Sequence, residues 1–373
     1  MGYIVTDRIE LSLFINGVEF PLGLDSFNVM KFLHMAESVK FRVPTCHFAV
    51  TDAGHSLDKI NLQDAIPIKI AVKGSGGPTR VYNFRKFNHK RTFEGDAFAY
   101  EMDGYFDAPR FWAGTAVSGF TGTSDGALSM LAQQNGLKYS GWKTNDSMTW
   151  MPGNRKQHAW ASEIEAHAYA GDDSFMRWGI DLEGNMRYRN ILGLQDSKKR
   201  IIAHQIVEGA ASAVDYEVLA GSGFSNASEG YGNNRFVQSA DGKGLVLSDL
   251  QFKADSRSPL FSKTMKEKVQ RGRITHSPIN FGTVHPNYER AAYQNARFES
   301  LYSLELSCQI FGQSYMDMFD VITFSTETEK QTEDAAYSGT YVVTGKAIYV
   351  EGATYSEKVF ISRMGVNQPY VSA

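Results

Sequence analysis

The strongest constraint on the fold is a succession of short segments in which apolar and polar residues alternate. Residues 9–15 alternate in this way, and Asn16-Gly17 and residues 18–20 follow directly. Successive side chains of a strand point to opposite faces of a sheet, so this alternation predicts strands with one buried face. Asn-Gly favours the type I′ turn that joins two antiparallel strands. The chain is therefore expected to begin with a β-hairpin.

The same pattern continues through residues 1–106, the predicted first module. Further strands are expected at 41–50, 66–72, 81–87 and 97–102, with a short helical patch at 27–36. About six strands at this spacing predict a small closed barrel or a sandwich. The content of 24 Phe and 18 Tyr also favours strands. The length of 373 residues suits two to four modules of roughly 100 residues each.

Residues 107–197 have a different pattern, which predicts an α+β module. Thr123 and Ser124 precede the apolar residues of 127–134, and Asn135-Gly136 follows them, so a capped helix is expected there. A second helix is predicted at 156–169, with Trp160, Ile164 and His167 on one face. Residues 178–188 then predict a hairpin that ends this module.

The rest of the chain predicts a second β-barrel module with an insertion. Residues 198–225 begin it, residues 226–285 form the insertion, and residues 286–373 complete it with a helix at about 286–300 and four strands. The polar, glycine-rich stretch 221–244 predicts a mobile loop. The expected fold class is thus mainly β, with two tail-tube-like β-barrel modules flanking an α+β module.

Charge and cysteine content limit the function. The net charge of −3 gives no general attraction to nucleic acid or to an anionic membrane. No apolar run reaches the roughly 20 residues that span a bilayer, and the first residues lack the pattern of a signal peptide. Cys46 and Cys308 have no metal-ligand spacing, so two buried free thiols are expected.

One motif resembles a catalytic one. Residues 122–126 fit G-x-S-x-G, the nucleophile elbow of serine hydrolases, in which a buried strand precedes the serine. Residues 117–121 are rich in glycine and hydroxyl groups, and the repeated βα units of a hydrolase sheet are missing. We therefore interpret Thr123 or Ser124 as a helix cap, with Asp125 placed favourably at the positive end of the helix.

Other polar clusters also predict no site. Helical spacing puts Glu163 and Glu165 on different faces, and Asp172-Asp173 follows in a turn, so solvated charge is the preferred interpretation over a glycosidase pair. The nine histidines show no zinc spacing. The basic residues at 198–200 and 263–273 lack the aromatic interleaving of a nucleic-acid surface. We expect no catalytic residue, no metal and no cofactor.

Three stretches, taken in order, carry a resemblance to a known family. They are the hairpin at Asn16-Gly17 with residues 64–70; residues 127–137 with 145–150, 159–160 and the hairpin 181–188; and residues 290–297 with 304–306, 338–344 and 357–363. This order resembles the baseplate and tail hub proteins of contractile phage tails. That family includes the late control protein D group and the base of the type VI secretion spike.

The resemblance implies a mechanical role. Hub proteins of this kind form homotrimers in which two similar barrels per chain make a ring of six. Such a ring would join a hexameric tail tube above to a trimeric spike below and leave a channel for DNA. Tape measure and baseplate wedge proteins are further expected partners, DNA only passes through, and no membrane is contacted. The expected location is the virion tail baseplate, and the host cytoplasm during assembly.

Two other functions fit the sequence less well. A non-enzymatic carbohydrate- or receptor-binding protein of the tail tip would also be rich in aromatic residues, and exposed Trp and Tyr in one shallow groove would favour it. A hydrolase that used Ser124 would place a histidine near that serine. No spike or lysozyme segment follows up to Ala373, so membrane piercing and peptidoglycan cutting are expected of another protein.

Overall fold

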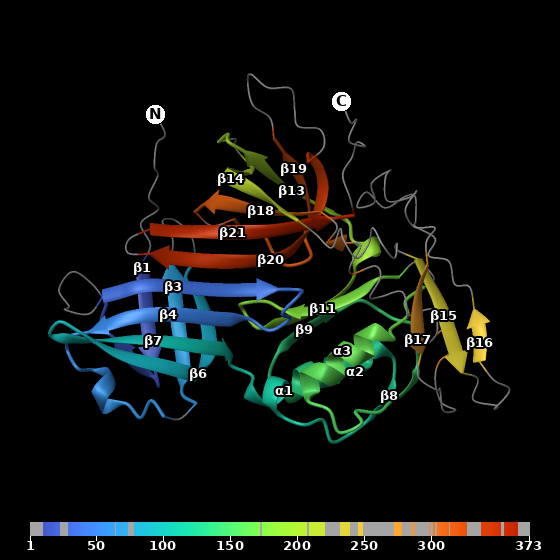
Figure 1. Ribbon diagram of the computed structural model, residues 1–373, viewed down its shortest axis with the longest axis horizontal. Helices are drawn as coiled ribbons and strands as arrows, with labels where there is room; N and C mark the ends of the chain where they lie inside the picture. The colour runs from blue at the N-terminus through green and yellow to red at the C-terminus, as the bar shows by residue number, and fades with distance from the viewer. Residues whose placement is uncertain are drawn as a thin grey trace.

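A computed structural model shows two β-rich modules stacked on one another and an α+β module beside them (Figure 1). It describes residues 10–22, 29–63, 65–73, 78–171, 174–206, 209–220, 301–302, 304–312, 314–326, 337–351 and 354–364, the strand backbones 232–238, 245–248 and 272–277, and the single residues His285, Asn287 and Phe298. One sheet of thirteen strands runs through both β-rich modules.

The first module holds one end of this sheet. Its strands are β1 (Glu10–Ile15), β2 (Val18–Phe20), β3 (Val29–Ser38), β4 (Thr45–Asp52), β5 (Pro67–Lys73), β6 (Arg80–Glu94) and β7 (Ala97–Phe106), with a 3-10 turn η1 (Leu57–Lys59). They pair in the order β2-β1-β5-β6-β7-β4-β3, and every pair is antiparallel. The predicted hairpin is confirmed, since Ile15 pairs with Val18 across Asn16-Gly17. Alternate residues such as Ile68 and Ile70 are buried in one core.

The second module is a closed barrel of six strands. They are β13 (Asp196–Ala203), β14 (Ala211–Ala220), β18 (Leu304–Phe311), β19 (Val321–Ser325), β20 (Gly339–Glu351) and β21 (Thr354–Arg363). The ladder runs β13-β14-β18-β21-β20-β19 and returns to β13, which closes the barrel. Leu306, Phe324, Tyr341 and Ile361 fill its core.

The two modules share one strand order. Numbered along the chain, with β2 left aside as an added hairpin strand, the six strands of each module lie in the spatial order 2-3-6-5-4-1. The bulge at Lys31 of β3 recurs at Val214 of β14, and the bulge at Phe87 of β6 recurs at Thr344 of β20. They differ at strand 1, which is antiparallel to strand 4 in the first module and parallel to it in the second. Among the described strands, strand 1 pairs with strand 2 and closes the barrel only in the second module. The predicted fold class is confirmed.

One predicted element is wrong. In the segment expected to be helical, the described part forms strand β3. Met30, Leu33 and Met35 are buried on one side of this strand, and it pairs with β4 on one edge and with β20 on the other. Met, Leu and Ala favour helices, but the preference is worth only tenths of a kcal/mol per residue. Pairing on both edges and burial of one face outweigh it here.

The middle module packs two helices on a small sheet. Its elements are α1 (Pro109–Ala113), β8 (Phe120–Gly122), α2 (Ser124–Gln134), β9 (Lys138–Gly141), β10 (Met148–Trp150), α3 (Gln157–Ala166), β11 (Met176–Ile180), β12 (Asn185–Asn190) and η2 (Ile191–Gly193). Both predicted helices and the predicted hairpin are confirmed. Trp160 and Ile164 are buried, His167 forms the C-cap of α3, and Gly184 turns the hairpin with a φ of +81°.

The predicted insertion holds a separate three-stranded sheet. It consists of β15 (Gly232–Gln238), β16 (Leu245–Ser248) and β17 (Gly272–Ser277) in the order β16-β15-β17. The stretch predicted as a mobile loop, 221–244, otherwise lies outside the described residues. The helix predicted at 286–300 also lies outside them, apart from Asn287 and Phe298.

Candidate functional surface

The two barrels meet edge to edge inside one chain. Strand β3 of the first module pairs with β20 of the second, from Ser38 opposite Gly345 to Phe32 opposite Glu351. Figure 1 shows β20 and β21 directly above β3 and β4. This junction joins eight strands, β14-β18-β21-β20-β3-β4-β7-β6, into one continuous wall.

One face of the junction is apolar and buried. Ile348 and Val350 of β20 lie opposite Met35 and Leu33 of β3, and all four side chains belong to the core of the first module. Tyr355, from the start of β21, belongs to the same core. The tip of the β20–β21 hairpin therefore completes the core of the other barrel. Burying a large aliphatic side chain contributes roughly 1.5–3 kcal/mol, so this contact ties the modules firmly.

A buried carboxyl group lies at the same junction. Glu37 of β3 stands opposite Lys346 of β20 in the register, and its Oε2 accepts a hydrogen bond from the Leu182 backbone N–H at 2.7 Å. Burial raises the pKa of Glu37 to about 7, against the opposing attraction of Lys346. Because Leu182 belongs to the middle module, one side chain connects all three parts of the chain.

The opposite face of the wall is polar. The ring of Phe32 contacts the rings of His34 and His47, at centroid distances of 5.1 and 4.9 Å. His47 Nδ1 is 2.7 Å from Asp103 Oδ1, and His34 packs edge-on against Tyr349 at 4.8 Å. These contacts cross from β20 through β3 and β4 to β7, so the polar face continues across the boundary between the barrels.

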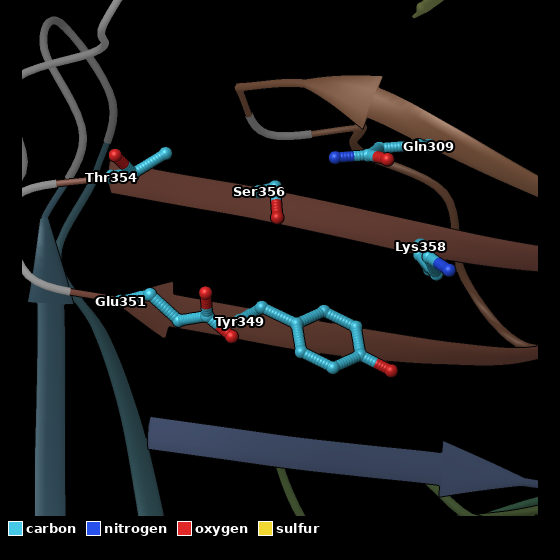
Figure 2. A pocket seen from close by; sticks show the side chains of 6 residues that line it. All are labelled: Gln309, Tyr349, Glu351, Thr354, Ser356 and Lys358. Atoms are coloured by element: carbon cyan, nitrogen blue, oxygen red, sulfur yellow. The ribbon is translucent and has the colours of Figure 1, made fainter. Parts of the chain in front are cut away.

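A shallow depression opens on this polar face. Figure 2 shows its six lining side chains on β18, β20 and β21, namely Gln309, Tyr349, Glu351, Thr354, Ser356 and Lys358. The lining has one carboxylate, one ammonium group and a single aromatic ring. Among the described residues no group of three metal-binding side chains occurs, in this depression or elsewhere.

The G-x-S-x-G serine lies far from this wall, in the middle module. Thr123 is the N-cap of α2 and accepts a hydrogen bond from the Gly126 N–H, which confirms the cap. Ser124 is fully buried and donates to Asp146 Oδ2 at 2.6 Å. Its other hydroxyl contacts within the described residues are Thr144 and Tyr188, with no histidine among them. Within the described residues this serine therefore lacks the histidine of a hydrolase triad, and its hydroxyl is buried.

The carboxylates of α3 are only in part as predicted. Glu163 forms a surface pair with Arg155, at 2.7 Å. The prediction of solvated charge is wrong for Glu165, which is buried and accepts hydrogen bonds from Arg177, from Arg42 and from the Trp178 N–H. A buried carboxylate needs such partners. Because they lie 12 or more residues away in the sequence, a local pattern does not reveal them.

The remaining predictions concern the cysteines, an acidic turn, a basic cluster and membrane-spanning segments. Cys46 and Cys308 are free and buried, as predicted, and burial raises the pKa of both thiols. Residues 172–173 and the basic cluster at 263–271 lie outside the described residues. No helix in the described part of the chain is long and apolar enough to span a membrane.

Comparison with known proteins rests on solved structures, because neither a family model nor a curated protein matches the sequence. The chain is similar to the 43 kDa tail protein of prophage MuSo2 from Shewanella oneidensis, with a TM-score of 0.63 and 9% identity over 95% of this chain and 98% of that one. A tail protein from Neisseria meningitidis MC58 gives the same TM-score and identity over 96% and 98%.

A third similar structure comes from a secretion system. It is an Escherichia coli component of the type VI secretion system that is described as structurally similar to the bacteriophage T4 tail proteins gp27 and gp5. The TM-score is 0.51, and the identity is 9% over 96% of this chain and 80% of that one. At such identities the likeness establishes a shared fold over nearly the whole chain.

Proposed function

We propose that this chain is the structural hub of a phage-type tail baseplate. Three copies would form a ring of six barrels that joins a hexameric tail tube to a trimeric spike, with a central channel for DNA during genome ejection. The observation that carries the proposal is the shared topology of the two modules, including both bulges. Two like barrels in one chain let a three-fold object present a six-fold surface.

The pairing between the barrels supports the ring. The β3–β20 junction already places two of the six barrels side by side with a shared sheet. Closed cyclic assemblies arise when one heterologous contact repeats with a rotation that closes. In the proposed ring, the junction within each chain alternates with a contact of the same kind between chains.

The polar face of the eight-stranded wall would line the channel. It carries the carboxylates of Glu101, Asp103 and Glu351 and the ammonium groups of Lys90 and Lys358. Tight binding of duplex DNA requires many Lys and Arg contacts to phosphates. A wall with this balance of charge would let DNA pass without holding it.

The partners and the location follow from the proposal. The ring would contact the tube protein above and the spike protein below, and tape measure and wedge proteins are further candidates. The protein would reside in the tail baseplate of the virion after assembly in the host cytoplasm, as a non-enzymatic component. We also propose the module boundaries 1–106, 107–197, 198–225, 226–285 and 286–373.

The tail-tip binder remains the second candidate, and one observation weighs against it. All five Trp residues lie in the described part of the chain, and none of them is exposed. The depression in Figure 2 contains one Tyr and no Trp. Carbohydrate sites usually present exposed aromatic faces, so this surface fits a channel wall better than a sugar groove.

The mass of the purified protein, together with images of the negatively stained particle, tests the proposal. We expect a trimer with a central hole, either alone at high concentration or with the tube protein added. Each interface between chains should bury more than about 1,000 Å². A particle that stays a single chain with tube protein present, and shows no three-fold image, would overturn the hub function.

A further inference from the structure

The shared topology of the barrels identifies two strand edges that match the internal junction. The junction uses strand 2 of the first module, β3, and strand 5 of the second, β20. Their counterparts are strand 2 of the second module, β14, and strand 5 of the first, β6. These two counterparts lie at opposite ends of the eight-stranded wall.

Both counterpart edges are open among the described strands. Strand β20 pairs with β19 before its bulge at Thr344 and with β3 after it. Strand β6 likewise pairs with β5 up to Arg85, just before its bulge at Phe87, but no described strand pairs with that edge from residue 87 to 94. Strand β14 pairs with β13 only up to Ala213, which leaves the same edge open over 214–220. Natural proteins rarely leave edges this long unprotected.

Two apolar positions of the junction recur on these edges, whereas Arg91 stands where the junction has Ile348. Aligned through the bulges, Phe93 corresponds to Val350, and Val218 corresponds to Met35. In the junction, Val350 and Met35 are 1% and 0% exposed, whereas Phe93 is 67% and Val218 is 45% exposed. The same two positions are therefore buried where a barrel neighbour is present and exposed where it is absent.

The hairpin tips repeat as well. The β20–β21 turn joins Glu351 to Thr354, and the β6–β7 turn joins Glu94 to Ala97 with the same spacing. Tyr355 at the first tip completes the core of the neighbouring barrel, and Phe98 is its counterpart. Phe93 and Phe98 form a ring pair at 5.2 Å on the second tip, which gives it an apolar surface of the same kind.

We infer that β6 of one copy pairs with β14 of a second copy of this chain, antiparallel and in the register of the β3–β20 junction. This inference rests on the proposed ring and names its contact between chains. When each residue of the β3–β20 junction is replaced by its counterpart in β14 or β6, Phe93 stands opposite Tyr216, Thr92 opposite Glu217, and Arg91 opposite Val218. The β6–β7 tip then covers the open end of the second barrel of the neighbouring copy.

One opposite-charge pair on the polar face fits this register, and one like-charge pair does not. Lys90 of β6 lies diagonally across from Glu217 of β14, at a separation that long side chains span. The register also sets Glu94 opposite Asp215 at its outer end. This is a like-charge pair, and the ammonium group of Lys31, which pairs with Glu94 in the same chain, offsets it.

The test is a disulfide across the inferred contact, in the full chain. Thr92 and Glu217 are both exposed, and their counterparts Tyr349 and His34 are direct partners in the junction. Thr92→Cys and Glu217→Cys in one chain should form disulfides between copies under mild oxidation, because Cα atoms of opposed residues lie within disulfide reach. We expect a shift on non-reducing gels from one chain to products of up to three chains. The native Cys46 and Cys308 are buried and need no replacement.

Two matched controls define the register. Thr92→Cys with Val218→Cys shifts the pair by one residue and points the two thiols to opposite faces, so it should not cross-link. Thr92→Cys alone measures random collision. Cross-linking of the matched pair no greater than that of the single variant, at high protein concentration, overturns the inference even if images show a ring. Matched cross-links without a three-fold ring would instead support the inference and overturn the hub proposal.

Discussion

The first and second barrels share their strand order but differ in what surrounds each one. The edge of the first barrel at β3 is covered by β20, and its core is completed by Ile348 and Val350. No described strand pairs with the equivalent edge of the second barrel at β14 over residues 214–220, and the apolar side chain of Val218 is exposed there. Because the strand order is the same in both places, we attribute the exposure at β14 to the absence of a neighbouring barrel and not to a difference in fold.

The largest expected effect is a difference in stability between two variants, one in the buried β3–β20 junction and one at the exposed edge of β6. Ile348→Ala removes buried atoms from the junction and should lower the free energy of unfolding by about 2–5 kcal/mol. Phe93→Ala removes a ring that is exposed in the single chain and should change that free energy by about 0.5 kcal/mol or less. Urea unfolding of the dilute protein measures both. Equal losses would mean that the two sites are not distinguished by burial.

The second effect is a dependence of stability on pH that arises from Glu37 in the β3–β20 junction. The folded pKa of Glu37, about 7, lies above its ordinary value of 4.5, so the folded state holds a proton that the unfolded state has lost in this window. Stability should therefore fall as pH rises from 4.5 to 7, by up to roughly 3 kcal/mol. Glu37→Gln should remove this dependence. Urea midpoints at pH 5 and pH 7.5 for both proteins test it, and parallel pH profiles would contradict it.

The third effect provides a control outside both barrels. Ser124→Ala removes the hydrogen bond to Asp146, a buried carboxylate that keeps the Ser124 and Tyr169 N–H donors. The loss should be about 1–3 kcal/mol, with assembly unchanged. Esterase and glycosidase assays should read the same background before and after the change. A drop in turnover in the variant would revive the hydrolase interpretation.

The smallest effect refines the inferred contact between copies. Lys90→Glu places a like charge near Glu217 and should weaken association by about 0.2–1 kcal/mol. Because Lys90 also stands opposite Glu101 of β7, the unfolding of the single chain is measured alongside, and only the loss of association beyond that change counts. The double change Lys90→Glu with Glu217→Lys should restore association. Sedimentation of the three proteins at one salt concentration measures this. Failure of the double variant to recover would place the two side chains apart.

The fold class could be predicted because strand alternation and turn residues are local signals. The Asn16-Gly17 hairpin and the Thr123-capped helix were found for this reason. Strand β3 was missed because its residues favour helices locally, and only its partners on both edges make it a strand. The ionic cluster of Glu165 was missed because Arg42 and Arg177 come from other elements.

The candidate surface could not be predicted from the sequence at all. Counterpart residues such as Phe93 and Val350, or Val218 and Met35, share little beyond apolar character, so the repeat leaves no visible trace in the amino acids. It is carried by bulge positions and strand pairing, which depend on contacts between distant segments. The resemblance to hub proteins predicted that two barrels would be alike, but not which edges would meet.

The long strand β20 has a consequence for how the chain unfolds. Its first residues are hydrogen-bonded to β19 and its last seven face β3, so a single strand serves both barrels. Neither barrel can lose this strand without exposing the core of the other. The two barrels are thus expected to exchange their amide protons together, as one cooperative unit, although each has the size of an independent domain.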